Sequence, residues 1–250
     1  VLHCLRPDAP KVVITVAGTN GKGSTVSMLD AVYRAAGYRV GTYTSPHLVH
    51  YGERIRVNGL KASDDSLCQA FHKIDQVRGV IPLTYFEFGT LAAVEIFAEE
   101  ALDVWIMEVG MGGRLDAVNV LEPDLAIITS VDLDHQAWLG DSRDAIAQEK
   151  AGILRFKGRA VVSDPAPPAA LLSRLGALQC ELRLMNRDFQ IEDAGTGKWV
   201  FSSVGTSWQE SSSIGDLEVT ASSPAWAQNM AGSLAALRML EDDLPVEPQH

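Results

Sequence analysis

Short runs of apolar, mostly β-branched residues alternate along the first part of the chain with longer amphipathic segments. The short runs, at 12–17, 40–43, 103–109, 125–129 and 160–163, have the length and composition of buried strands. The longer segments carry apolar residues at helical spacing, at 25–36, 64–77, 86–101 and 144–151. This alternation predicts an α/β fold in which a doubly wound, mostly parallel sheet is covered by helices on both faces.

The pattern changes from about Arg183. Short alternating runs at 189–192, 199–203 and 217–220 are separated by glycine and serine clusters, which predicts a small antiparallel β subregion over 183–222. An amphipathic helix is expected over 228–240. Earlier in the chain, an Asn-Gly pair inside 53–62 predicts a hairpin turn.

A polar glycine loop, Gly18-Thr19-Asn20-Gly21-Lys22-Gly23-Ser24, follows the first predicted strand and precedes the first predicted helix. Strand, glycine loop and helix form the architecture that holds phosphate, because backbone N–H groups, a helix N-terminus and a lysine all point inward. The fit to the P-loop pattern is loose: Val16 stands at the first glycine position and the hydroxyl comes one residue late. A simple tight turn is the alternative, and the flanking strand and helix favour a P-loop type site.

The composition of the 250 residues narrows the class of protein. A net charge of -11 gives no basic footprint for nucleic acid. No apolar run approaches the ~20 residues that span a bilayer, so no membrane contact is expected. Three scattered cysteines are typical of reduced thiols in the cytoplasm. The chain lacks an initiator methionine and ends in an acidic, proline-containing stretch, 242–250, so we expect a fragment that ends in a linker.

Four polar residues follow strand or helix ends in order: Ser45, Glu108, His135 and Lys150. In a doubly wound sheet such ends converge on one crevice beside the phosphate loop. Glu108 is the strongest single candidate for a magnesium ligand, because magnesium prefers oxygen. Plainer interpretations stay open: Glu108 paired with a buried arginine, His135 in a structural hydrogen bond, Ser45 opening a turn, and Lys150 in solvent.

Five ordered motifs together resemble the folylpolyglutamate synthase family, which includes the bifunctional dihydrofolate synthases and is related to the Mur ligases. The motifs are Gly18-Thr-Asn-Gly-Lys-Gly-Ser24, Thr44-Ser-Pro-His-Leu48, Glu108-Val-Gly-Met-Gly-Gly-Arg-Leu-Asp116, Leu133-Asp-His135 and Glu149-Lys-Ala-Gly-Ile153. The segments 83–88 and 135–140 resemble the bacterial bifunctional branch in particular. The resemblance implies that residues 1–241 form a Mur-ligase-like central ATP-binding domain, with 242–250 leading toward a C-terminal domain that this sequence does not contain.

The resemblance also implies roles for single residues. ATP phosphates would bind at Gly18, Thr19, Asn20, Gly21, Lys22, Gly23 and Ser24, and Asn229 would contact the base. Ser45 and Glu108 would bind one Mg²⁺, and Glu108 and His135 a second. Lys150 matches a lysine that is carbamylated in the family, so Lys22, Glu108, His135 and Lys150 are the expected catalytic set. Thr84, Phe86, Asp116 and Ala117 match positions that contact the pterin of dihydropteroate.

The implied reaction is an ATP-dependent ligation in folate biosynthesis. A carboxylate of dihydropteroate or a folate would attack the γ-phosphate of ATP, and the amine of L-glutamate would then displace phosphate from the acyl phosphate. A monomer is expected. Three alternatives are kept: another Mur-type amino-acid ligase, an ATP- or pterin-binding fragment without activity of its own, and a generic P-loop kinase. No motif beyond the loop supports the kinase.

Overall fold

The computed structural model describes residues 1–5, 7, 9–203 and 217–247, and these form one large sheet, one small sheet and the helices around them. The strands of the large sheet are β1 (Val12–Ala17), β2 (Val40–Tyr43), β3 (Ile55–Val57), β4 (Leu60–Lys61), β5 (Val104–Glu108), β6 (Leu125–Ile128), β7 (Arg159–Val162) and β8 (Glu181–Leu184). Their order is β4-β3-β2-β5-β1-β6-β7-β8. The run from β2 to β8 is parallel, and the hairpin β3–β4 adds an antiparallel edge.

The longer helices are those that the apolar spacing predicts, together with one more. They are α2 (Lys22–Ala35), α3 (Asp64–Arg78), α4 (Tyr85–Glu99), α6 (Arg143–Lys150), α7 (Ala169–Ala177) and α8 (Pro224–Met239). Shorter turns are α1 (Leu2–Leu5), α5 (Gln136–Leu139) and the 3-10 helices η1 (Tyr51–Arg54), η2 (Ala117–Val120) and η3 (Ala151–Ile153). The doubly wound, mostly parallel α/β prediction is confirmed.

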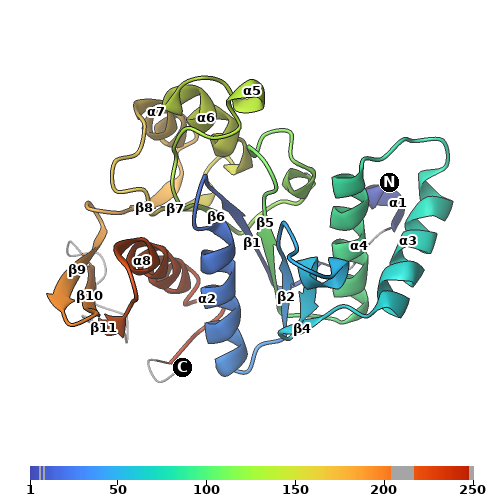
Figure 1. Ribbon diagram of the computed structural model, residues 1–250, viewed down its shortest axis with the longest axis horizontal. Coiled ribbons are helices and arrows are strands. Elements are labelled where there is room, and N and C mark those ends of the chain that lie inside the picture. The colour runs from blue at the N-terminus through green and yellow to red at the C-terminus, as the bar shows by residue number, and fades with distance from the viewer. Residues whose placement is uncertain (6, 8, 204–216, 248–250) are drawn as a thin grey trace.

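Two apolar cores lie on the two faces of the sheet. Val12, Ile14 and Val16 of β1 belong to the core that α2 and α8 cover, and α2 packs directly against α8 (Figure 1). Val13 and Ala17, which alternate with them, belong to the opposite core, which is completed by residues of α4, α6 and α7. This period of two, with both faces buried, is what a central parallel strand requires.

The C-terminal third departs from the sequence expectation in three places. Helix α7 and strand β8 are present although the pattern predicts neither, and β8 extends the parallel sheet. Arg183 and Leu184 therefore lie in β8, whereas the sequence assigns them to the antiparallel subregion. That subregion is β9 (Phe189–Gly195), β10 (Lys198–Ser203) and β11 (Leu217–Thr220), paired antiparallel in the order β11-β10-β9.

The stretch expected to be a linker, 242–250, packs against the domain over the part that the structure describes. Leu244 is fully buried and Val246 nearly so, both in the core of α2 and α8. Asp243 pairs with Arg159, and the carbonyl of Pro245 accepts a hydrogen bond from Tyr38. Residues 243–246 thus pack on the domain through the apolar side chains of Leu244 and Val246. The acidic composition of the stretch had predicted a linker instead. Residues 204–216 of the expected subregion and 248–250 of the expected linker lie outside the described residues.

Candidate functional site

The glycine loop after β1 is held in a shape that only glycine permits at two of its positions. Gly21 has a φ of 87° and caps the N-terminus of α2, and a Cβ there would lie 2.2 Å from Oδ1 of Asn229. A Cβ on Gly18 would lie 1.8 Å from the Thr129 hydroxyl oxygen. The loop therefore packs against both β6 and α8 with no room for a side chain.

Helix α2 begins at Lys22, three residues earlier than the pattern predicts, so Lys22, Gly23 and Ser24 form its first turn. Their N–H groups are among those that an α-helix leaves without an internal partner, and they carry the positive end of the helix dipole. The Lys22 ammonium folds back over the loop and donates to the carbonyls of Gly18, at 3.0 Å, and Thr19, at 3.3 Å. A helix N-terminus and a lysine that converge in this way form a site for an anion, and phosphate is the anion that such loops hold.

Sheet order brings Glu108 and Ser45 to this loop. β5 lies between β2 and β1, and Glu108 is in register with Val16 at the carboxyl ends of the strands. The Ser45 N–H donates to Oε2 of Glu108 at 3.1 Å. A Cβ on Gly23 would lie 3.7 Å from the same oxygen, so the carboxylate faces the first turn of α2.

Glu108 is 4% exposed, and burial raises the pKa of its carboxyl group to about 6, against the lowering effects of the Ser45 N–H and the Lys22 charge. A buried carboxylate is costly to leave charged without a cationic partner. Ser24, Ser45 and Glu108 line one cavity of about 630 Å³, so three oxygen-bearing side chains face the same space. This donor set fits Mg²⁺, which takes one or two carboxylates and keeps several waters. Within the described residues, no group of three or more His, Cys, Asp or Glu side chains is arranged to hold a metal.

Lys150 is the last residue of α6 and is buried, with 3% of its surface exposed. The pKa of its ammonium is lowered to about 8, because burial and, to a smaller extent, the charge of Lys22 lower it more than Asp134 raises it. Lys150 is therefore close enough to Lys22 and Asp134 for their charges to act on it. The sequence alternative of a solvated lysine is excluded.

His135 lies at the edge of the site rather than beside Glu108. Its side chain is 54% exposed, its backbone is left-handed with a φ of 48°, and its Nε2 lies 3.6 Å from Oδ2 of Asp134. His135 does line a cavity of about 720 Å³ together with Lys22 and Ser45. Among the contacts of the described residues, the partner of the His135 ring is therefore Asp134, and the position of the ring supports no direct pairing with Glu108.

The same cavity, which we call the ligand cavity, contains the four residues expected to contact a pterin: Thr84, Phe86, Asp116 and Ala117. Thr84 caps α4 and its hydroxyl accepts the Glu87 N–H. Asp116 accepts N–H bonds from Met111 and Val118, and burial raises the pKa of its carboxyl group. Residues from α4, the glycine-rich loop after β5 and α5 thus enclose one space beside Lys22.

A third cavity, of about 410 Å³, lies on the other side of the loop. We call it the α8 cavity; its lining includes Asn20, Gly21, Ser130, Asp132 and Asn229. Asn229 is 8% exposed and is the side chain that Gly21 packs against, so it lies beside the phosphate loop, and its contact with a nucleotide base stays a prediction.

Several residues of these cavities were missed from the sequence. Arg54, Arg114 and Trp138 line the ligand cavity, Arg34 and Arg56 the cavity of Glu108, and Arg143 and Asp164 the α8 cavity. Two of them carry a signal in the sequence: Arg114 stands in the motif from Glu108 to Asp116, and Trp138 stands in the segment 135–140 that resembles the bifunctional branch. The other four arginines lie on helices or on β3, where charge is ordinary, so nothing local distinguishes Arg34, Arg54, Arg56 and Arg143.

Curated relatives share this sequence across nearly its whole length. The chain is 44% identical over 240 residues to the dihydrofolate synthase/folylpolyglutamate synthase of Escherichia coli, and 40% identical over 232 residues to that of Haemophilus influenzae. These alignments cover 95% and 93% of this chain, and 53% and 51% of the two relatives. The chain therefore spans about half the length of the curated relatives it matches.

Solved structures give the same result for the fold. Escherichia coli FolC in complex with DHPP and ADP superposes with a TM-score of 0.84 at 39% identity, covering 98% of this chain and 58% of that one. A bifunctional folylpolyglutamate synthase/dihydrofolate synthase with Mn, AMPPNP and L-glutamate bound superposes with a TM-score of 0.84 at 39% identity, covering 99% of this chain and 57% of that one. Among the described residues, none of the helices combines the length and apolar character of a membrane-spanning segment.

A family description of the Mur ligase middle domain matches residues 16–237, which extend from the end of β1 to the last turn of α8. This range includes the phosphate loop, Glu108, Lys150 and Asn229, the residues whose packing defines the site. The chain belongs to the Mur ligase middle domain family.

Proposed function

We propose that this chain is the ATP-binding part of a ligase that joins L-glutamate to dihydropteroate or to a reduced folate, with release of ADP and phosphate. One observation carries the proposal: the ligand cavity contains Lys22 of the phosphate loop and all four residues expected to contact a pterin. A pterin substrate and a phosphoryl donor would therefore meet in one space. Relatives and solved neighbours named as dihydrofolate synthase/folylpolyglutamate synthase support the same reaction class.

In the proposed reaction, a carboxylate oxygen of the pterin substrate attacks the γ-phosphorus of ATP. The bond from that phosphorus to the β,γ-bridging oxygen breaks, ADP leaves, and an acyl phosphate forms. The amine of L-glutamate then attacks the acyl carbon, loses a proton and expels phosphate. Two anions must approach each other in the first step, and Lys22 with the N-terminus of α2 offsets that repulsion where charge develops.

We further propose that Ser45 and Glu108 hold one Mg²⁺ and that Glu108 and His135 contribute to a second. When bound, the metal would neutralise phosphate charge. The buried Glu108 carboxyl and its Ser45 contact support the first site. The second is the weaker proposal, because the His135 ring pairs with Asp134 in this structure.

Lys150 is proposed to carry a carbamate. An uncharged amine attacks CO₂, an N–C bond forms and a proton leaves, which turns a cation into a carboxylate. A lysine with its pKa lowered to about 8 supplies the uncharged amine more readily than a solvated lysine does. Nuclear magnetic resonance with isotopically labelled bicarbonate would show a carbamate signal in the wild type and none in Lys150→Met. The absence of a signal in the wild type contradicts the carbamate.

The free thiols of Cys4, Cys68 and Cys180 support a reducing compartment, and we propose the cytoplasm. We also propose that the protein acts as a monomer.

The decisive experiment measures phosphate release from the 250-residue chain with Mg-ATP and dihydropteroate, with and without L-glutamate. Release that depends on glutamate supports the full ligase reaction. Lys22→Ala and Glu108→Ala are then expected to reduce it at least ~10²-fold, because each removes charge stabilisation of the transition state. Lys61→Ala, an exposed lysine of β4, is the matched control. Turnover near wild type in either site variant contradicts the assignment.

A second candidate, binding of ATP and pterin without turnover, is kept for these 250 residues taken alone, which cover 53% and 51% of the two curated relatives. Calorimetric binding of ATP or dihydropteroate without phosphate release would select it. A uridine-nucleotide substrate that competes with dihydropteroate would instead indicate another Mur-type ligase. A wild-type chain that binds none of these ligands would overturn the proposal.

A further inference from the structure

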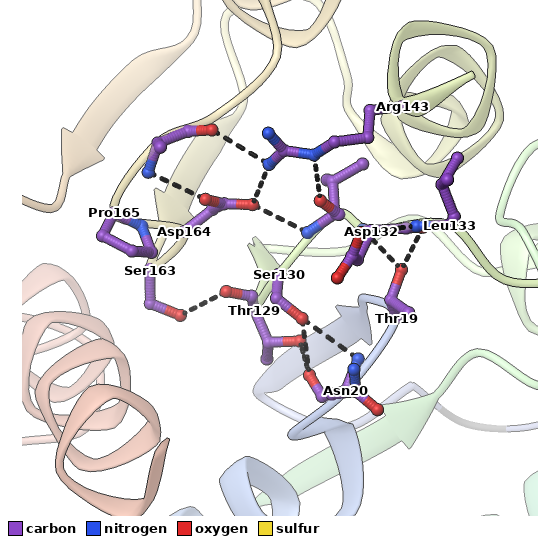
Figure 2. A network of polar contacts seen from close by, with 12 residues as sticks. Thr19, Asn20, Thr129, Ser130, Asp132, Leu133, Arg143, Ser163, Asp164 and Pro165 are labelled. Carbon is purple, nitrogen blue, oxygen red and sulfur yellow. Dashed lines mark hydrogen bonds and ion pairs between the residues drawn. The ribbon is translucent and has the colours of Figure 1, made fainter. Parts of the chain in front are cut away.

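An arginine and an aspartate on the far side of the phosphate loop form an ion pair that the proposed chemistry does not use. Arg143 opens α6 and Asp164 follows β7, and the distance from Nη2 to Oδ2 is 3.4 Å. The Asp164 side chain is 5% exposed, and that of Arg143 is 43% exposed. Both line the α8 cavity beside Asn20, Gly21 and Asn229. Figure 2 shows the pair above the segment from Thr129 to Asp132.

The two side chains hydrogen-bond to the backbone N–H and carbonyl of a single residue, Val131, and we call this arrangement the bracket around Val131. Oδ2 of Asp164 accepts the Val131 N–H at 2.7 Å, and Nε of Arg143 donates to the Val131 carbonyl at 2.8 Å. The bracket is itself fixed, because Oδ1 of Asp164 accepts the Ala166 N–H and Nη2 of Arg143 donates to the Ala166 carbonyl. Both polar backbone groups of Val131 are therefore satisfied by side chains from elements that lie outside the loop.

The segment that contains Val131 is in turn hydrogen-bonded to the phosphate loop. The Thr19 N–H donates to the Ser130 carbonyl at 2.7 Å, and the Asp132 N–H donates to the Thr19 hydroxyl at 3.0 Å. The Asn20 N–H donates to the Ser130 hydroxyl at 3.0 Å, and the Asn20 carbonyl accepts the Thr129 hydroxyl at 2.6 Å. Figure 2 shows Thr19 and Asn20 hydrogen-bonded to the segment that runs from Thr129 to Asp132. The phosphate loop is thus hydrogen-bonded to residues 129–132, and these residues are hydrogen-bonded in turn to Arg143 and Asp164.

We propose that Arg143 and Asp164 are positioning residues that set the conformation of the phosphate loop through Val131. The inference rests on the proposed function in one respect, the nucleotide that the loop would hold. The backbone N–H groups of such a loop must point at phosphate oxygens. In enzymes, a misplacement of about 1 Å at a positioning group lowers the reaction rate about 10²-fold. The pair acts by keeping 129–132 seated against Thr19 and Asn20.

The test compares three variants of the whole chain. Arg143→Lys keeps the charge but loses the planar guanidinium that bonds to Val131, Asp164 and Ala166 at once. Asp164→Asn keeps the shape but replaces one accepting oxygen with a donor. Arg155→Lys is the matched control, since Arg155 also uses its guanidinium to hold backbone carbonyls, those of Asn119 and Leu121. Those carbonyls belong to the segment around η2, and not to residues 129–132, which are hydrogen-bonded to the phosphate loop.

Amide hydrogen exchange of the ligand-free chain is the first readout, alongside urea unfolding. Arg143→Lys and Asp164→Asn are expected to speed exchange at residues 18–24 and 129–132, and Arg155→Lys is expected to leave those residues unchanged. Unchanged exchange in both site variants, or equal acceleration in the control at the same loss of unfolding free energy, overturns the inference. If one site variant fails to fold, hydrogen exchange in the other variant decides whether the pair positions the phosphate loop.

Calorimetry with Mg-ADP is the second readout. The dissociation constant is expected to rise about tenfold in Arg143→Lys and Asp164→Asn, and to stay within about twofold of wild type in Arg155→Lys. Wild-type binding with no change in the site variants overturns the inference. A wild-type chain that binds no nucleotide defeats the proposed function instead, and the exchange result then still decides the positioning role.

Discussion

The two sides of the phosphate loop bury ionisable groups in opposite ways. On the side of Glu108 and Lys150, burial dominates: the pKa of Glu108 rises to about 6 and that of Lys150 falls to about 8. On the side of the α8 cavity, Asp164 is equally buried but accepts N–H bonds from Val131 and Ala166 and pairs with Arg143. An ionisable side chain whose desolvation exceeds the stabilisation from its hydrogen-bond and charge partners can exchange protons or bind cations. A buried side chain whose partners offset its desolvation instead holds the backbone in place.

The largest effect is expected where the two sides meet, at Gly21. Gly21→Ala would place a Cβ 2.2 Å from Oδ1 and 2.8 Å from Cγ of Asn229 at a φ of 87°, so the Asn229 side chain or the loop must shift. We expect nucleotide binding to fall more than ~10²-fold and the free energy of unfolding to fall by about 1–3 kcal/mol. Calorimetry with Mg-ADP and urea unfolding measure the two effects.

Gly37→Ala is the matched control for that variant. Gly37 has a φ of 89°, and no described atom lies within 4 Å of a Cβ built there. It therefore carries the cost of a left-handed backbone without the collision. Equal loss of nucleotide binding in both variants would show that backbone strain, and not the contact with Asn229, governs the site.

An intermediate effect is expected from Lys150→Met. With a pKa of about 8 in the folded chain and 10.5 as its ordinary value, Lys150 costs the folded state on the order of 3 kcal/mol below pH 8. The unfolded chain binds more protons between pH 8 and 10.5, so this cost is relieved as the pH rises through that window. Lys150→Met should therefore raise the free energy of unfolding at pH 7 and change it little near pH 10.

Urea unfolding at the two pH values, in buffer free of bicarbonate, makes this measurement. Arg143→Met is the comparison on the same helix, and it should lower stability at both pH values because it breaks the bracket around Val131. A Lys150→Met chain that is less stable than wild type at pH 7 would mean that the ammonium is well paired.

The smallest effect is expected at the rim of the ligand cavity. The exposed carboxylate of Glu53 accepts N–H bonds from Leu48, Val49 and His50, and these bonds hold its pKa down to about 2. Glu53→Gln should loosen this turn, which follows Ser45, and weaken dihydropteroate binding by a few-fold at most. Because the folded pKa is depressed, the carboxylate contributes stability above pH 4.5 and loses it as the pH falls through about 2.

Unfolding of wild type and Glu53→Gln from pH 7 to pH 2 tests that sign. The difference between the two proteins should shrink toward the acid end. A difference that grows on acidification would contradict the hydrogen-bond origin of the depressed pKa.

Local pattern predicted the features that depend on local chemistry. The alternation in β1, the glycine loop and the polar residues after β2 and β5 are each readable in a few consecutive residues, and the structure places Ser45 and Glu108 in contact. Helix α7 and strand β8 were missed because three prolines precede α7 and charged residues interrupt β8. The buried tail at Leu244 was missed because its composition is acidic.

The bracket around Val131 was beyond sequence reasoning for another reason. Arg143 and Asp164 are 21 residues apart, and neither stands in a recognisable motif. Their function depends on where β7 ends and where α6 begins relative to β6, which only the assembled sheet determines. The same holds for the displaced pKa of Lys150, since a lysine at a helix end is ordinarily solvated.

The contact between Gly21 and Asn229 has a consequence for the order in which the chain matures during synthesis. The phosphate loop leaves the ribosome well before α8 does, yet one wall of its site is a side chain of α8. Nucleotide cannot stabilise the nascent chain until α8 has emerged and docked, so contacts of high sequence separation must form without that help. Nucleotide affinity of chains shortened from the C-terminus would therefore report complete folding, appearing only once residue 229 is present.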